Sequence, residues 1–191
     1  MERMVMKQDE TNQRITLTDL ILSVSTGEDG APTRPIIRSA TLEVTDQVFR
    51  AIVATILGQE RATPVGTLRF HDAQWVDGGA LISLRLKAGP MPATVTIHAS
   101  LEATPSGRLL VRLRRAKAGP VPFTLLLIPL VEQLAERPGF YKVDDLAFEI
   151  DIGEQLRAQN VPLEFSASVR EVAIRPGLAR LVARDHGAHV P

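Results

Sequence analysis

Hydrophobic and polar residues alternate with a period of two along most of the chain. This period predicts β-strands that bury one face and expose the other, as in antiparallel sheets. Short segments rich in Gly, Pro, Asp and Ser separate the middle strands, so the strands between residues 68 and 113 are expected to form a meander. The strands are predicted at residues 15–24, 36–44, 68–70, 82–86, 95–101, 109–113, 143–150, 163–169 and 172–174.

A first helix is predicted at residues 45–57, where hydrophobic side chains recur with the period of an α-helix. Thr45 or Asp46 can cap its N-terminus, because their side-chain oxygens can accept hydrogen bonds from the first backbone amides. Gly58 follows the last apolar residue and is a typical helix stop. The apolar stripe predicts that one face of this helix is buried.

A second helix is predicted at residues 122–137, and its first turns are hydrophobic almost all round, which predicts a buried element. Pro129 lies inside this segment and is expected to remove a hydrogen bond and to kink the helix. A third, shorter helix is predicted at residues 152–159, with Asn160 as its stop.

The composition of the 191-residue chain is that of a globular protein, with 45% hydrophobic residues. No Gly/Ser-rich linker divides it, so we expect one domain at residues 14–183 with flexible tails at 1–13 and 184–191. The 22 basic and 22 acidic residues cancel and only 4% of residues are aromatic, which argues against a nucleic-acid binder.

The sequence also indicates whether the chain spans a membrane or is exported. The longest apolar stretch, residues 121–131, is far shorter than the roughly 20 residues of a membrane span. The N-terminal residues do not have the pattern of a signal peptide. We therefore expect a soluble, cytoplasmic protein that contacts membranes at most peripherally.

Residues that could support catalysis are few. The absence of cysteine excludes disulfides and thiolate chemistry. His71 and Asp72 could form a general-base dyad, but no nucleophile accompanies them, so a surface hairpin is the favoured interpretation. Asp144 and Asp145 are neighbours in a strand and should point to opposite faces. We expect no catalytic residue, no metal site and no cofactor, and hence a protein that is not an enzyme.

Basic residues gather on the exposed face of the predicted meander. Arg85, Lys87, Arg112 and Arg114 share this face. Near an anionic membrane each basic residue contributes about 1 kcal/mol, so the four residues are candidates for contact with lipid headgroups. The alternative is an ordinary solvated strand face.

The order of elements resembles the tubular lipid-binding (TULIP) superfamily, and within it the bacterial LmeA-like phospholipid-binding proteins. The resemblance covers residues 15–183. It depends on patterns of hydrophobicity rather than on invariant motifs. The segments that carry it are an amphipathic helix at 45–57, a meander at 66–117, an apolar helix at 123–136, and the segments 143–151 and 169–178.

This resemblance implies an α+β fold in which a highly curved antiparallel sheet wraps around a long amphipathic helix, with a second apolar helix. It further implies an apolar channel that binds a phospholipid or a fatty acid, with lipid transfer at a membrane surface as a further expectation. The residues expected to line the channel are Val48, Phe49, Ile52, Val53, Ile56, Leu126, Leu127, Leu130 and Val131.

The competing hypothesis is an interaction or scaffold protein of the same fold with a filled core. Such a protein would dock a partner through its basic face or its edge strands, and edge strands could also pair two copies into a homodimer. The apolar residues alone do not separate a channel from a solid core.

Overall fold

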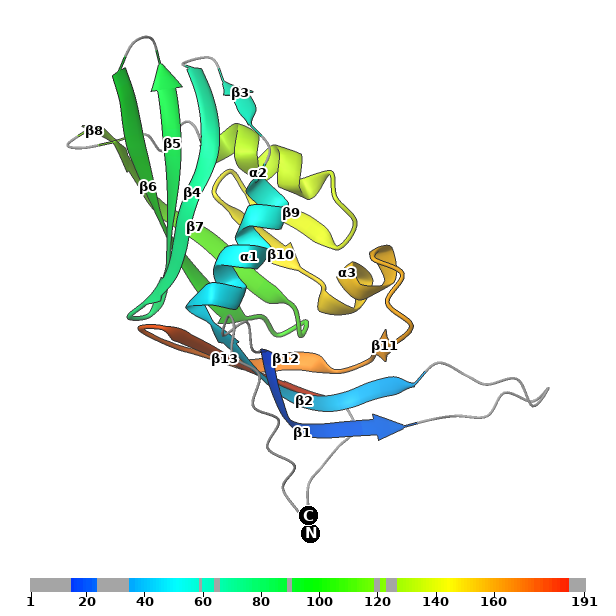
Figure 1. Ribbon diagram of the computed structural model, residues 1–191. Coiled ribbons are helices and arrows are strands. Elements are labelled where there is room, and N and C mark those ends of the chain that lie inside the picture. The colour runs from blue at the N-terminus through cyan, green and yellow to red at the C-terminus, as the bar shows by residue number, and fades with distance from the viewer. Residues whose placement is uncertain are drawn as a thin grey trace.

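The computed structural model describes residues 15–23, 35–58, 60–63, 66–88, 91–118, 121–122 and 127–185. In these residues the chain forms two β-sheets and three helices (Figure 1). The α+β class and the antiparallel pairing of the main strands are confirmed. The predicted tails lie outside the described residues, except for residues 184 and 185 of the C-terminal tail.

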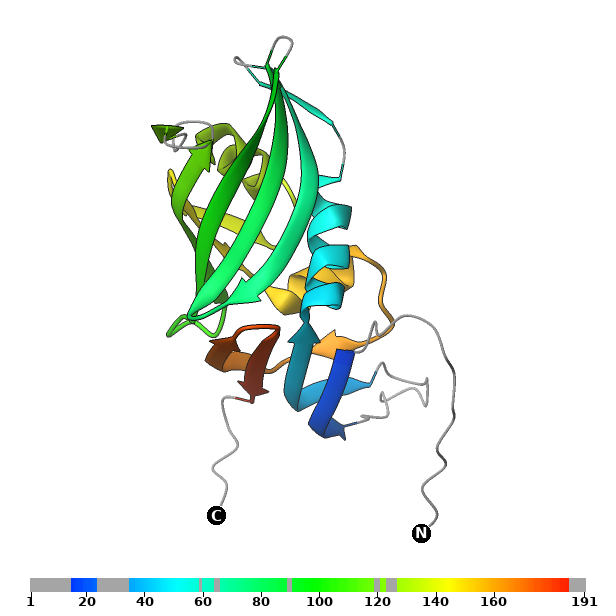
Figure 2. The same ribbon diagram turned by 60° about the vertical axis from the view of Figure 1, so that its left-hand side comes forward.

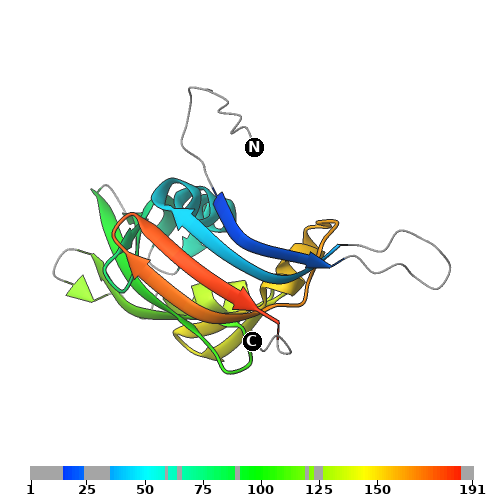
Figure 3. The ribbon, with the colours of Figure 1, turned by 90° about the horizontal axis from the view of Figure 1, so that it is seen from below.

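The smaller sheet has five strands and is seen from below in Figure 3. Four of them are antiparallel neighbours, and the short fifth strand pairs with β2 in parallel. In spatial order the four are β1 (Ile15–Ser23), β2 (Ile36–Thr45), β13 (Leu178–Arg184) and β12 (Ser168–Arg175), and the fifth is β11 (Glu164–Phe165). Strand β13 was not predicted from the sequence.

The larger sheet has eight strands and contains the predicted meander, which is confirmed as β4 to β7. Strand β8 (Val121–Pro122) pairs with β7 at the side of the main path. The main path runs β3 (Arg61–Thr63), β4 (Gly66–Val76), β5 (Gly79–Ala88), β6 (Met91–Ala103), β7 (Leu109–Ala118), β10 (Ala147–Ile150) and β9 (Phe140–Asp144).

The segment predicted as a strand at residues 143–150 is a hairpin of β9 and β10. The Asp144 carboxylate accepts a hydrogen bond from the backbone N–H of Leu146 at 2.8 Å, which closes the turn between the strands. Asp side chains commonly stabilise turns in this way. The three-residue step from Val143 to Leu146 in the apolar pattern marks this turn.

Helix α1 (Asp46–Leu57) follows β2 directly, with Thr45 at the N-cap position and Gly58 at the C-cap position as predicted. The expected capping hydrogen bond is not formed, because the Thr45 hydroxyl has no partner among the described residues. Helix α3 (Ile152–Ala158) also matches its prediction. The Asp151 side chain caps it by accepting a hydrogen bond from the N–H of Glu154 at 2.9 Å, and Asn160 lies just beyond its end with a positive φ of 54°.

Helix α2 (Leu127–Ala135) is shorter than the helix predicted at residues 122–137. The start of that prediction is wrong at residue 122, which pairs in β8, and residues 123–126 lie outside the described part. Pro129 is the third residue of α2 within its described bounds, and proline is tolerated best in the first turn of a helix. The expected kink stays a prediction, because residues 123–126 lie outside the described part.

The prediction of one highly curved sheet around a long helix is wrong. The strands divide between two sheets, neither of them strongly curled, and the longest helix of the described chain, α1, has 12 residues. At 1.5 Å per residue, α1 is about 18 Å long. The division arises because β2 pairs with β13 rather than with the meander, in the register Val44 with Ala179.

Helix α1 lies against β4 (Figure 2), and the two elements share part of the core. The ring of Phe49 stacks on that of Trp75, with centroids 3.8 Å apart and planes 22° apart. The Asp46 carboxylate accepts a hydrogen bond from the backbone N–H of Trp75 at 2.6 Å. The N–H of Asp46 in turn donates to the carbonyl of Gly177 at 3.2 Å, so the two sheets meet at the start of α1.

The turn between β6 and β7 also touches the smaller sheet, and this contact gives a test of the packing. Gly107 has a φ of +81°, and a Cβ added there would lie 2.3 Å from the Cβ of Ser168. We expect Gly107→Ala to lower the free energy of unfolding by more than the roughly 1–2 kcal/mol that a left-handed backbone costs alone. Urea denaturation measures the loss.

Gly78→Ala is the matched control. Gly78 has a similar φ of +69°, but an added Cβ would meet nothing within 4 Å. Its loss of stability should therefore contain the backbone cost only. Equal losses for the two variants would show that the turn does not pack against Ser168 in solution.

Candidate functional site

The residues predicted to line an apolar channel come from α1 and α2. Most of them lie in one hydrophobic cluster, together with inward-facing residues of β4 to β7. Val48, Phe49, Val53, Leu127 and Val131 are buried in this cluster, and Ile56 and Leu130 are partly buried against it. Ile52 is instead 44% exposed. Leu126 lies outside the described residues.

The side chains around the predicted channel are closely covered by other protein atoms. Val131 has no exposed surface and Leu127 is 2% exposed. In the same hydrophobic cluster, Val95 and Ile97 of β6 are each 1% exposed. A surface that faces a space large enough for an acyl chain would be accessible to solvent, so these four side chains contact protein atoms rather than such a space. The acyl-chain channel stays a prediction.

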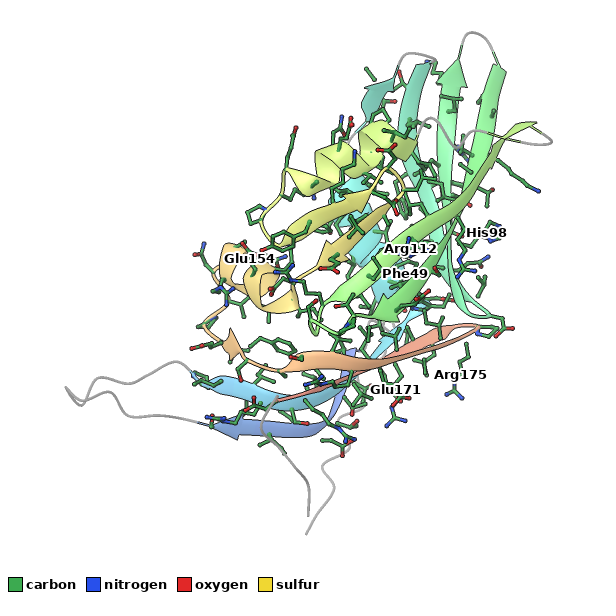
Figure 4. All side chains as sticks on the ribbon, turned by 180° about the vertical axis from the view of Figure 1, so that it is seen from behind. Phe49, His98, Arg112, Glu154, Glu171 and Arg175 are labelled. Carbon is green, nitrogen blue, oxygen red and sulfur yellow. The ribbon has the colours of Figure 1, made fainter. Side chains whose placement is uncertain are left out.

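The predicted basic residues lie on the opposite, outer face of the larger sheet. In β5 the side chains alternate, with Leu84 and Leu86 buried and Arg85 and Lys87 exposed. Figure 4 shows His98 of β6 projecting from the same outer face. The predicted placement of Arg85 and Lys87 on an exposed strand face is thus observed.

Arg112 and Arg114 are exposed as well, but each has an acidic partner. The Arg112 guanidinium lies 3.2 Å from the Asp144 carboxylate. The Arg114 guanidinium lies 3.7 Å from the Glu102 carboxylate, and its Nε donates to Ser100 Oγ at 3.1 Å. These two residues are therefore less available to an external anion than Arg85 and Lys87 are.

Arg85 and Lys87 have no carboxylate within 4.0 Å in the part of the chain that the structure describes. The same holds for two exposed neighbours, Arg69 of β4 and Lys117 of β7. Arg69 lies directly opposite Arg85 in the strand register, and Lys117 lies opposite Thr96. We call Arg69, Arg85, Lys87 and Lys117 the basic outer face.

Sequence reasoning did not select Arg69, although the signal was present. Arg69 stands between Leu68 and Phe70, so the alternation that exposes Arg85 exposes it too. Like charges directly opposite each other destabilise an antiparallel pair by a few tenths of a kcal/mol or more. The Arg69–Arg85 pair therefore does not serve the stability of the sheet.

A second polar cluster joins β7, β9, β10 and α3. The Arg108 guanidinium lies over the ring of Tyr141, 4.1 Å from its centroid, and pairs with Glu149 at 3.3 Å and with Asp151 at 3.7 Å. The Tyr141 hydroxyl donates a hydrogen bond to the Glu154 carboxylate, and this bond raises the pKa of Tyr141. Because every member has a partner within the cluster, these residues hold elements together.

Sequence analysis did not single out Tyr141 or Glu154, since the cluster combines residues from distant elements. Next to this cluster, the Lys142 ammonium lies 3.0 Å from the Asp145 carboxylate. The hydrogen bond between the two groups raises the pKa of Lys142. Asp144 and Asp145 thus bind different partners, consistent with the expectation that they do not form one site.

The candidate dyad of His71 and Asp72 is also engaged elsewhere. The Asp72 carboxylate lies 2.5 Å from Arg50 Nε of α1, while His71 is exposed. Within the described residues, no three His, Asp or Glu side chains are placed to hold a metal ion. No helix among them is both long enough and apolar enough to cross a bilayer.

Comparisons of the chain with protein-family models, with curated proteins and with solved structures found no match. The resemblance to the TULIP superfamily therefore stays a prediction from the sequence. The candidate functional feature that the geometry itself offers is the basic outer face.

Proposed function

We propose that the protein is a non-enzymatic binding protein that docks on anionic phospholipid surfaces through its basic outer face. One observation carries the proposal. Four exposed cations project from one sheet face and have no carboxylate within 4.0 Å among the described residues. Arg112 and Arg114 of the same sheet are instead paired with acidic side chains. The strands β5 and β7 contain no acidic residue, and Glu102 is the only one in β6.

The spacing of the cations suits a surface that carries many negative charges. Neighbouring strands are about 4.8 Å apart, so Lys117 on β7 lies two strands, or about 10 Å, from the cations of β5. The four cations are therefore spread over the face, and a plane of headgroups can contact all of them at once. Each basic residue near an anionic membrane contributes about 1 kcal/mol to binding.

A nucleic acid is a less suitable partner for this face. Proteins that bind single strands stack bases on aromatic side chains. The aromatic rings of β4, Phe70 and Trp75, pack on the core side of the sheet. Between the cations the outer face instead presents Thr94, Thr96 and His98, and the whole chain has a net charge of zero.

Vesicle binding tests the proposal. We expect the purified chain to sediment with vesicles that contain phosphatidylserine and not with pure phosphatidylcholine vesicles. Raising the salt should release it, because the screening length falls from about 10 Å at 0.1 M to about 3 Å at 1 M salt. Equal binding to both kinds of vesicle, or binding to DNA but not to vesicles, would contradict the proposal.

Binding of an acyl chain is the second candidate function. The observation that favours it is that α1 and α2 both contribute to one apolar cluster on the inner face of the larger sheet. Lipid contact at the outer face and lipid uptake at the inner face are separable, since uptake involves the apolar cluster and surface docking does not.

A further inference from the structure

Strand β1 forms an edge of the smaller sheet and is unusually apolar for such a position. Within the described residues it pairs with β2 alone, and no described strand pairs with its other side (Figure 3). Its hydrophobic side chains are exposed: Leu17 by 52%, Leu20 by 42%, Ile21 by 57% and Leu22 by 48%. Soluble proteins generally protect such an edge, because it can pair with another strand.

Charged residues protect the other long edges but not this one. Strand β12, at the opposite edge of the same sheet, exposes Glu171 and Arg175, which Figure 4 shows on its outer side. Strand β9, at an edge of the larger sheet, carries Lys142 and Asp144. Strand β1 has one charged residue, Asp19.

Asp19 does not protect the edge. Its backbone has a positive φ of 52°, at an irregularity in the pairing with β2. Its carboxylate accepts a hydrogen bond from Thr41 Oγ1 at 3.3 Å, so the charge is directed back to the strand's own sheet.

We propose that β1 pairs with β1 of a second copy of this chain, antiparallel about a two-fold axis, which joins two five-stranded sheets into one. A two-fold interface brings the same surface of both copies together, so it must be self-complementary. A mainly apolar strand without cations meets this requirement. Strand β12 instead packs against β4 and β6 of the larger sheet, and β9 has only five residues. Among the described strands of comparable length at a sheet edge, β1 is the one that fits.

The expected dimer is weak. Nine residues of strand are about 30 Å long, and a sheet is about 10 Å thick, so the paired edge covers about 300 Å² on each copy. A standard stable interface buries about 800 Å² on each partner. Dimers should therefore form and dissociate with protein concentration rather than persist on dilution.

Sedimentation velocity of the full chain without lipid, over a wide range of concentrations, tests the inference. We expect the mass to rise from 20.9 kDa to twice that value as concentration increases. Ile21→Lys should weaken the dimer at least roughly tenfold, because it places two like charges at the paired edge. Circular dichroism checks that this variant folds, which is expected since Ile21 is 57% exposed.

Val143→Lys is the matched control, since Val143 is 49% exposed and also lies on an edge strand, β9. It should leave the dimer unchanged. The inference is overturned if the wild type stays monomeric, if both lysine variants dissociate equally, or if the mass grows beyond a dimer. It is also overturned if Ile21→Lys reduces vesicle binding but not self-association. Because the dimer forms without lipid, its failure would leave the proposed function standing.

Discussion

Replacing Val131 with tryptophan is expected to lower the free energy of unfolding by about 1–3 kcal/mol, the usual cost of adding bulk to a well-packed core. Val131 has no exposed surface and belongs to the cluster that joins α2 to the larger sheet. For a chain of this length each kcal/mol lowers the melting temperature by roughly 2–4 °C. Urea and thermal denaturation of the purified variant measure the effect.

The expected loss separates a filled core from an acyl-chain channel. If the space beside Val131 were a channel, the indole ring would occupy room that a ligand uses, and the ligand-free protein would keep its stability. In that case uptake of a fluorescent fatty acid by the variant would fall sharply. Wild-type stability combined with lost uptake would therefore contradict the filled core and support the channel.

Ile52→Trp provides the control. Ile52 belongs to the same set of predicted lining residues, but its side chain is 44% exposed. The change should alter stability by no more than about 0.5 kcal/mol, as is usual for surface substitutions. If Ile52→Trp destabilises as much as Val131→Trp, the loss does not report on packing in the core.

The sequence predicts the local elements well, because their signals lie within the elements themselves. The stripe of α1 and its end at Gly58, the cap of α3 and the alternation in the meander each require only a short window of sequence. The division into two sheets has no such signal. It depends on contacts such as Val44 with Ala179, which lie far apart along the chain.

The same distinction holds for the candidate site. Alternation in β5 is sufficient to place Arg85 and Lys87 on an exposed face. Alternation cannot show that Arg112 is paired, because its partner Asp144 comes from β9 and reaches it only through the β10 hairpin. The paired and unpaired cations look alike in the sequence, and only the sheet order separates them.

Because the cations of the basic outer face have no acidic partner among the described residues, their removal should have a large effect on vesicle affinity. A variant with Arg69, Arg85, Lys87 and Lys117 replaced by Gln should bind phosphatidylserine vesicles roughly a thousandfold more weakly than the wild type. Four contributions of about 1 kcal/mol sum to about 4 kcal/mol, and about 1.4 kcal/mol corresponds to a factor of ten. The fold should persist, since all four side chains are exposed and removal of the Arg69–Arg85 repulsion relieves the sheet.

The control must change the net charge equally without touching this face. Arg157 of α3 and Arg175, Arg180 and Arg184 of the smaller sheet are exposed, and their replacement by Gln removes the same four charges. If docking occurs through the basic outer face, this second variant should lose far less affinity in the same vesicle titration. Equal losses would mean that the vesicle responds to net charge alone. A larger loss for the second variant would move the docking surface to the smaller sheet.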